Sequence, residues 1–408
     1  MPLSGGLRDD AVKILFLTQL SPYPPSSGGA IKTYNILKHL GSRHEISLLT
    51  FIRRESEISA LSHLSEYCRK IEFCVITRSG MRDILHGARS LAAGKSFIIT
   101  RDWHPEMQAK VLRFLRDEPE LLYVDHLQMF QFVPHPAPCP VLLDDHNVEW
   151  RIIERFASTC TAPARRLFAS LEWRKLRSYE LRACRNAGVV LTVTPQDREV
   201  LISNGVSAEK VVMLPIGTDT EYLNPVRLDR EASNVLTFGT MSWPPNADAV
   251  AYFGRTIYPL VKRRVPTVRF TVVGANPPAE IRALGKDDPS VKVTGYVDDV
   301  RTTAEGAAVF VVPLRIGSGM RVKILDAMAL GLPVVTTSIG CEGISLRAGE
   351  HALVADTPDE FARAVIRLLL NYEERARLGS AGRNLVETLY SWPPILDRLD
   401  EVVSRIER

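Results

Sequence analysis

Short β-branched segments alternate with longer amphipathic segments along this chain, and the alternation begins again after Arg230. This order predicts parallel sheets with helices on both faces, because two parallel strands need a crossover connection between them. In the first half we expect strands at Lys13–Thr18, Glu45–Phe51, Ile71–Thr77, Leu121–Asp125, Val141–Asp145 and Gly188–Thr194, and helices at Ile31–Leu40, Glu57–Lys70 and Arg82–Ala93.

The same alternation of segments in the second half of the chain predicts another doubly wound domain. We expect strands at Val235–Phe238, Arg269–Val273, Val291–Thr294, Ala308–Val312 and Pro333–Thr337, and helices at Asn246–Lys262, Arg321–Leu330 and Pro358–Leu370. Since 408 residues exceed the size of one hydrophobic core, we expect domains at 1–228 and 229–390, joined through the polar segment Asn224–Asn234. Residues 391–408 hold an amphipathic helix that we expect to pack back on the first domain; a surface helix of the second domain is the alternative.

Composition excludes several classes of protein. With 45% hydrophobic and 24% charged residues the chain is of globular type, and its formal charge of +4 is mild. The positive excess lies before about residue 230, which favours an anionic partner for the first half or a basic solvated face. Because the opening residues do not resemble a signal peptide and the six cysteines form no Cys-x-x-Cys, we expect a cytoplasmic protein without a metal site.

Ligands of open α/β sheets bind in the loops that follow the carboxyl ends of strands. The first such loop is Thr18–Ala30, in which Ser27, Gly28 and Gly29 precede a helix expected to begin near Ile31. Glycine amides at a helix N-terminus can bind a phosphate, although a loop that only needs positive φ is the alternative. The dinucleotide fingerprint Gly-x-Gly-x-x-Gly does not follow this strand.

The second loop carries a cluster of polar side chains at a strand end, Asp144-Asp145-His146-Asn147-Val148-Glu149-Trp150. An imidazole at this place can form hydrogen bonds with substrate hydroxyls or phosphate. The structural alternative is that Asn147 caps the following helix.

The third loop combines glycines with cations. A strand is expected to end at Leu314, followed by Gly317-Ser318-Gly319 and a helix that starts near Met320. Arg321 and Lys323 would then lie in the first helical turn, where cations oppose the helix dipole, so we expect an anion there. Lys323 and Asp326 share a helix face and could hold a diphosphate and sugar hydroxyls; a surface ion pair between them is the alternative.

A fourth loop, Gly239–Asn246, again joins a strand to a helix. Gly239 follows the strand, and we expect Asn246 to cap the helix. Trp243 in this loop would suit packing or stacking.

These loops, in this order, resemble the GT4 family of retaining glycosyltransferases, and more narrowly the bacterial group 1 sugar transferases of exopolysaccharide systems. The segments that carry the resemblance are Pro22–Gly29, Asp145–Glu149, Pro215–Asp219, Gly239–Asn246, Gly317–Pro333 and Glu350-His351. The resemblance implies the GT-B fold, in which two Rossmann-like domains face each other across a cleft. It also implies that the nucleotide binds mainly to the second domain and the acceptor mainly to the first.

The resemblance also implies roles for residues. Arg321 and Lys323 would hold the donor diphosphate, and Asp326 takes the place of the second Glu of the family's Glu-x7-Glu motif, which binds ribose. Ser318 stands where the first Glu is expected. The implied set comprises His146, Arg321 and Lys323 for catalysis, Gly28, Gly29, Gly239, Ser318, Gly319, Met320 and Asp326 for the donor, and Asp145, Asn147 and Glu149 for the acceptor or sugar.

The expected function is retaining transfer of a hexose from a UDP- or GDP-sugar to a hydroxyl of a glycan or polyprenyl-linked acceptor, in cell-surface polysaccharide synthesis and without a metal or other cofactor. A nucleotide-sugar epimerase or hydrolase and a catalytically silent binding subunit are the alternatives. Arg165–Arg185 is basic and amphipathic, which favours peripheral contact with the anionic inner face of a membrane or a plain solvated face. Nucleic-acid binding is not expected, for want of a dense basic patch with interleaved aromatics.

Overall fold

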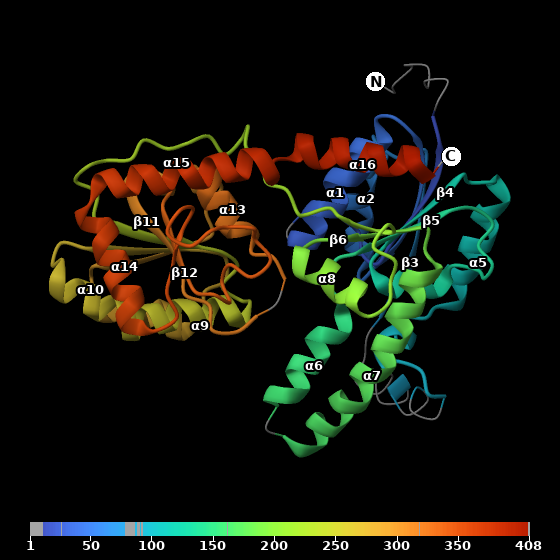
Figure 1. Ribbon diagram of the computed structural model, residues 1–408, viewed down its shortest axis with the longest axis horizontal. Coiled ribbons are helices and arrows are strands. Elements are labelled where there is room, and N and C mark those ends of the chain that lie inside the picture. The colour runs from blue at the N-terminus through green and yellow to red at the C-terminus, as the bar shows by residue number, and fades with distance from the viewer. Residues whose placement is uncertain are drawn as a thin grey trace. The chain divides into compact units, whose positions relative to one another are not determined.

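The computed structural model describes residues 11–25, 27–77, 86–87, 90, 93–160, 162–317 and 319–406. The chain divides into two compact units (Figure 1), unit 1 with Met1–Ile216 and Leu396–Arg408, and unit 2 with Gly217–Ile395. Within these described residues, each unit holds one parallel sheet, of seven strands in unit 1 and of six in unit 2. The expectation of two Rossmann-like domains is therefore confirmed.

The sheet of unit 1 has the strand order β3-β2-β1-β4-β5-β6-β7. Its strands are β1 (Lys13–Thr18), β2 (Glu45–Ile52), β3 (Lys70–Val75), β4 (Leu121–Asp125), β5 (Val141–Asp145), β6 (Val189–Thr192) and β7 (Val211–Met213). The chain builds outward from β1 to β3 and then returns to the other side of β1 with β4. This reversal creates a switch point between β1 and β4, where the loops after the two strands diverge and leave space for a ligand.

Helices cover both faces of this sheet. They are α1 (Gly28–Gly41), α2 (Ile58–Leu64), α4 (Phe97–Thr100), α5 (Pro105–Phe114), α6 (Glu149–Thr159), α7 (Pro163–Asn186) and α8 (Pro195–Ser203), with 3-10 turns η1 (Glu55–Glu57), η2 (Leu115–Asp117) and η3 (Leu127–Phe132). One face packs buried strand residues against α5, η3 and α7 in a single hydrophobic core. The expected helix Arg82–Ala93 lies almost wholly outside the described residues.

Helix α1 begins at Gly28, three residues before the expected start near Ile31. Ser27 causes this early start, since it has extended backbone angles and its Oγ accepts a hydrogen bond from the Ala30 amide. The helix is also held near its other end, where His39 and Arg43 contact Asp400 of α16 (Trp392–Ile406) at 2.8 Å and 2.7 Å. Residues 396–408 thus form part of unit 1 (Figure 1).

The sheet of unit 2 repeats this topology with the order β10-β9-β8-β11-β12-β13. Its strands are β8 (Asn234–Phe238), β9 (Arg269–Val273), β10 (Val291–Gly295), β11 (Ala307–Val312), β12 (Val334–Thr336) and β13 (Leu353–Val354). Here the chain reverses between β8 and β11, so the loops that follow these two strands flank the second switch point.

Alternating strand residues supply two separate cores in unit 2. Val309 and Val311 pack on one face, whereas Phe310 and Val312 pack on the other. The helices are α9 (Pro244–Tyr252), α10 (Tyr258–Arg264), α11 (Ala279–Asp287), α12 (Val300–Ala304), α13 (Val322–Ala329), α14 (Pro358–Leu370) and α15 (Tyr372–Leu389), with a π turn η4 at Phe253–Ile257. Both faces of the sheet are therefore buried, as its apolar strands require.

Two helix starts of unit 2 differ from the sequence expectation. Helix α9 begins at Pro244, because proline suits the first helical position, so Asn246 lies inside the helix and does not cap it. Helix α13 begins at Val322, which makes Arg321 its N-cap instead of a first-turn residue. Among the helices that the structure describes, none combines the length and the apolar character needed to cross a bilayer.

Candidate functional site

A buried carboxylate occupies the switch point of unit 1. Asp125, at the end of β4, pairs in register with Thr18 at the end of β1, and it is completely buried. Its carboxylate accepts hydrogen bonds from Thr18 Oγ1 at 2.6 Å and from Thr33 Oγ1 of α1 at 3.1 Å. These contacts tie α1 to the carboxyl ends of the two strands.

Two histidines share this carboxylate. His126 Nδ1 lies 2.8 Å from Asp125 Oδ2, and His146 Nε2 lies 2.8 Å from Asp125 Oδ1. The two rings stack with centroids 4.0 Å apart and planes inclined by 20°. One nitrogen of each ring is thus held by Asp125, and the other nitrogen is available to a substrate.

The remaining ring nitrogens face the first turn of α1. A β-carbon placed on Gly29 would lie 3.4 Å from His146 Nδ1 and 3.6 Å from His126 Nε2. Glycine at this position therefore lets the helix start approach both rings closely. Because the first amides of a helix have no partner within it, Gly28 and Gly29 place two N–H donors next to the imidazoles.

Charge distinguishes the two histidines. Burial alone would lower the pKa of His126, but the neighbouring Asp125 carboxylate outweighs it and raises this pKa to about 9. Burial and the positive His126 lower the pKa of His146. His126 is thus a cation at neutral pH and His146 is neutral, so an imidazolium, an imidazole and two helix-start amides meet at one place. Such a set suits an anionic group.

Sequence reasoning missed His126. The signal was its place directly after a predicted strand end, next to an aspartate. The structure adds a second signal, since His126 has a φ of 73°, a left-handed conformation that residues other than glycine rarely adopt. Backbone strain of this kind is often found at functional sites.

Asp144 is a structural partner of the same cluster. Its carboxylate accepts hydrogen bonds from Lys32 Nζ at 2.5 Å and from the Tyr123 hydroxyl at 2.7 Å. Lys32 and Asp144 are fully buried, so each compensates the charge of the other. This ion pair fixes α1 against β5.

The start of α6, which follows the polar residues after Asp144, is held by the Glu180 carboxylate of α7. The Glu149 and Trp150 amides donate to the Glu180 carboxylate of α7 at 3.1 Å and 3.2 Å, whereas Asn147 precedes the N-cap position and does not cap the helix. Burial, together with the negative charge of Glu149, raises the pKa of Asp145 well above its usual range. Contacts of Asp145, Asn147 and Glu149 with a sugar or an acceptor stay a prediction.

In unit 2 the corresponding site surrounds Lys323. Its Nζ donates to Asn246 Oδ1 of α9 at 2.8 Å, while Asn246 Nδ2 donates to the Thr240 carbonyl at 3.0 Å. Gly239, at the end of β8, has a φ of 150°, and a β-carbon on it would lie 3.5 Å from Lys323 Nζ. Glycine 239 therefore keeps a side chain away from the ammonium group and leaves it open on that side.

Arg321 lies beside Lys323. Its guanidinium donates to the Gly319 carbonyl, and a β-carbon on Gly317 would come within 2.7 Å of Arg321 Nη2. The glycines, with φ of 141° and 79°, thus allow the arginine to fold back over the loop. Burial, with Arg321 as a second cause, lowers the pKa of Lys323 to about 7. Met320 is half-buried in the same loop, and Ser318 lies outside the described residues.

Asp326 has a different partner from the one considered in the sequence. In place of an ion pair with Lys323, its Oδ1 accepts a hydrogen bond from Thr218 Oγ1 at 2.5 Å. Burial raises the pKa of Asp326 to about 6, against the opposing effect of Thr218. Thr218 belongs to the Pro215–Asp219 segment, so this hydrogen bond joins two of the loops that carry the family resemblance.

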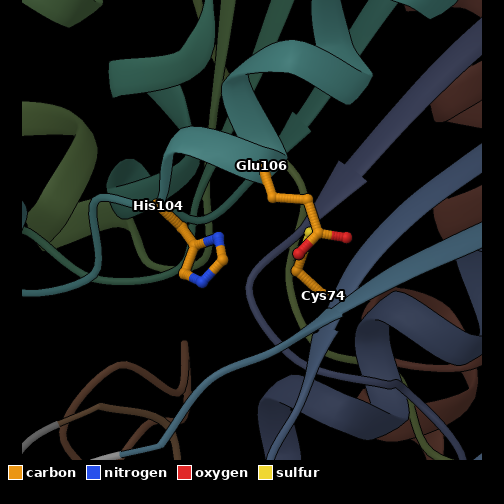
Figure 2. Close-up of side chains that lie close together, drawn as sticks. All are labelled: Cys74, His104 and Glu106. Carbon is orange, nitrogen blue, oxygen red and sulfur yellow. The ribbon is translucent and has the colours of Figure 1, made fainter.

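Among the residues that the structure describes, two groups of side chains could each supply three ligands to a metal ion. One is Asp125, His126 and His146, and the other is Cys74 of β3 with His104 and Glu106 at the start of α5 (Figure 2). In the second group, Lys110 Nζ lies 2.8 Å from Glu106 Oε1. Burial raises the pKa of the Cys74 thiol to about 11. The second group is thus a neutral thiol beside a lysine–glutamate pair, which is a weak ligand set for a cation.

Comparison with known proteins identifies relatives of both units. Residues 232–371 match the family model "Glycosyl transferases group 1". An uncharacterised 44.6 kDa protein in the cps region of Klebsiella pneumoniae is 22% identical over 88% of this chain and 91% of its own length. A GDP-mannose-dependent alpha-(1-6)-phosphatidylinositol monomannoside mannosyltransferase of Mycobacterium tuberculosis is 28% identical over 52% of this chain, and the match spans 60% of that protein.

Solved structures share the fold of the whole chain. HepE of Anabaena, crystallised in complex with UDP, superposes with a TM-score of 0.70 over 96% of this chain and 100% of its own, at 15% identity. Likeness at this level of identity concerns the fold, and it agrees with the two parallel sheets described above.

Proposed function

We propose that this chain, whose residues 232–371 carry a group 1 glycosyl transferase domain, transfers a hexose from a UDP- or GDP-sugar to a hydroxyl of a glycan or lipid-linked acceptor, with retention at the anomeric carbon. The observation that carries the proposal is the placement of Lys323, Asn246 and Gly239 together at the switch point of unit 2. This is where open α/β sheets bind their ligands.

Unit 2 is proposed to bind the donor. Lys323 and Arg321 lie at the start of α13, where the helix dipole also favours an anion. A diphosphate would bring negative charge to Lys323, and it would displace the Asn246 amide oxygen as the partner of Lys323. Gly239, Gly319, Met320 and Ser318 are assigned to the same donor, and Asp326 to its ribose hydroxyls.

Unit 1 is proposed to bind the acceptor. His126 and His146 are held by Asp125 and direct their second nitrogens towards Gly29. We propose that His146 and His126 contact the reacting groups of the substrates. The Gly28 and Gly29 amides would contact an anionic group of the substrates.

The proposed reaction exchanges one bond at the anomeric carbon. The acceptor oxygen forms the new bond, the bond to the diphosphate oxygen breaks, and the acceptor proton passes to the departing diphosphate. Arg321 and Lys323 would lower the barrier by stabilising the negative charge that develops on the leaving group. Since these side chains supply the positive charge, we propose that the transfer needs no metal ion.

The relatives support a role in cell-surface polysaccharide synthesis. By their names, the relative from Klebsiella pneumoniae lies in a cps region, and the mycobacterial relative is a GDP-mannose-dependent phosphatidylinositol monomannoside mannosyltransferase. We propose a cytoplasmic enzyme that works at the inner face of the membrane.

A screen of donors tests the proposal. Thermal shift with UDP, GDP and ADP identifies the base, because a ligand that binds the native state raises the melting temperature. Incubation with the matching sugar nucleotide and an acceptor panel then gives the product, whose anomeric configuration is determined by NMR. A product of inverted configuration contradicts retention. Consumption of donor without acceptor indicates an epimerase or hydrolase, and binding without turnover indicates a silent subunit.

A further inference from the structure

Three side chains of unit 1 that take no part in the proposed reaction could bind a metal ion together. They are Cys74 near the end of β3 and His104 and Glu106 at the start of α5 (Figure 2). The sulfur, one ring nitrogen and one carboxylate oxygen all lie within 4.8 Å of one another. Since zinc binds such atoms at about 2.0 to 2.3 Å, small side-chain movements would bring all three to one ion.

The backbone presents these ligands from two packed elements. Strand β3 forms one edge of the sheet of unit 1, and α5 belongs to the same hydrophobic core as Cys74. His104 has extended backbone angles at the N-cap of α5, and Pro105 takes the first helical position. Because proline fixes φ, His104 and Glu106 are held by a rigid helix start. An ion on the three side chains would therefore join the edge strand to α5.

The His104 ring has a buried nitrogen without a partner. Within the residues that the structure describes, no group forms a hydrogen bond with His104 Nδ1. Buried polar atoms are almost always satisfied, so this nitrogen indicates a missing partner. Figure 2 shows the ring facing the Glu106 carboxylate, close to Cys74. A neutral imidazole nitrogen in this position can satisfy its lone pair by binding a metal ion.

The neighbouring lysine leaves Glu106 able to bind an ion. Lys110 Nζ lies 2.8 Å from Glu106 Oε1, and a carboxylate has a second oxygen for the metal. Lys110 also donates to the Phe73 carbonyl at 2.5 Å and lies 3.9 Å from Glu72 Oε2. Lys110 would therefore keep two partners if Glu106 turned towards an ion.

The ligand set selects the kind of ion. While the Cys74 thiol keeps its proton, the set is weak for a hard cation such as Mg²⁺. A thiophilic ion displaces that proton: the bond between sulfur and metal forms, and the proton passes to the buffer without any change of oxidation state. Thiolate, imidazole and carboxylate are all zinc ligands, and the two anionic ligands compensate the charge of Zn²⁺.

We propose that Cys74, His104 and Glu106 bind one Zn²⁺ ion, which fastens the edge strand β3 to the start of α5. Cys74 is 1% exposed, whereas the Glu106 side chain is 54% exposed. The ion would thus enter from the Glu106 side and shield the sulfur from solvent. This site does not rest on the proposed function. The ion should raise the melting temperature and leave the initial rate of transfer unchanged.

Titration with Co²⁺ tests the site, because Co²⁺ replaces Zn²⁺ in tetrahedral sites and its spectrum reports the ligands. The full-length chain is used reduced, free of metal and without a histidine tag. We expect one equivalent of Co²⁺ to produce a charge-transfer band from thiolate to metal, which Zn²⁺ removes and excess Mg²⁺ leaves unchanged. Absence of this band at saturating Co²⁺ overturns the proposal.

Variants of the ligands assign the signal. Cys74→Ser should abolish the charge-transfer band. Glu106→Gln, at an exposed position where folding is not at risk, should weaken Co²⁺ binding at least about tenfold, since losing a ligand costs no less than losing one of its outer partners. Cys68→Ser is the matched control, because Cys68 is also a buried free cysteine of unit 1, and it should bind like the wild type. Unchanged Co²⁺ binding in Glu106→Gln contradicts the site.

The group of Asp125, His126 and His146 is the competing location for an ion. Cobalt binding that persists in Cys74→Ser and is lost in His126→Gln would place the ion there and overturn the proposal. Calorimetry with Zn²⁺ in two buffers of different ionisation enthalpy should show release of about one proton, that of the thiol. Zinc should raise the melting temperature of the wild type and not that of Cys74→Ser, and an equal rise in both excludes Cys74 as a ligand.

Discussion

The rings of His126 and His146 stack with centroids 4.0 Å apart, and each ring is hydrogen-bonded through one nitrogen to a different carboxylate oxygen of Asp125. A single buried carboxylate therefore orients two imidazoles at the switch point of unit 1. Because only one of the rings is positive at neutral pH, the pair combines a fixed cation with a neutral imidazole that can accept or donate a proton.

The charge on His126 should make stability depend on pH. Its pKa in the folded protein, about 9, lies above the ordinary value of 6.5. The charged His126 therefore stabilises the folded protein fully below pH about 6.5, and this stabilisation is lost as the pH rises through about 9. It amounts to roughly 3 kcal/mol at most. We expect the difference in unfolding free energy between wild type and His126→Gln to shrink over this range, as measured by urea denaturation. A difference that is constant from pH 6 to 9.5 contradicts the assigned charge.

The lowered pKa of Lys323 predicts that UDP affinity depends on pH. With a pKa of about 7, the free ammonium loses its proton as pH rises, and the neutral amine no longer attracts the diphosphate. We expect the dissociation constant for UDP to rise about fivefold from pH 7 to pH 8 in calorimetry. Lys323→Arg is the control, since arginine stays charged, and its affinity should be nearly flat over this range. An equally steep dependence in this variant excludes Lys323 as the titrating group.

Much of the fold follows from local sequence patterns. Strands such as Lys13–Thr18, Leu121–Asp125 and Arg269–Val273 have the predicted bounds, because buried parallel strands are short runs of β-branched residues. Helix starts were less predictable, since Ser27 begins α1 through a side-chain hydrogen bond that no periodicity contains.

The sequence pattern brings candidate site residues together only where one loop contains them. Arg321, Lys323 and the neighbouring glycines are close in sequence, so their chemistry could be recognised together. The pair Thr218 and Asp326 is separated by 108 residues, and the interactions of Asp125 in β4 reach β1, α1 and the loop after β5. Such contacts depend on strand order and register, which the sequence pattern does not specify.

Removal of metal ions should leave the transfer unchanged. Arg321 and Lys323 are proposed to supply the charge that a divalent cation would otherwise provide. We expect the same initial rate in EDTA after dialysis against the chelator as in magnesium or manganese. A loss of activity that manganese or zinc restores contradicts the proposal and would direct attention to Asp125, His126 and His146.

The basic face of α7 predicts binding to anionic membranes. Arg165, Arg166 and Arg174 are exposed beside Leu167 and Leu171. In flotation with vesicles that contain anionic lipid, we expect salt-sensitive binding that weakens in the double variant Arg165→Glu/Arg166→Glu, since each basic residue near the surface contributes about 1 kcal/mol. Neutral vesicles are the control. Absence of binding to anionic vesicles at low salt supports a plain solvated helix face.

The most direct test of the account is the rate of sugar transfer by Lys323→Ala, with the exposed surface variant Lys286→Ala of the same unit as its control. Because Lys323 is proposed to stabilise the leaving diphosphate, the account predicts a loss of at least about a hundredfold, with circular dichroism and melting temperature close to those of the wild type. A folded Lys323→Ala protein that transfers sugar at a rate near that of Lys286→Ala contradicts the assignment of the donor site.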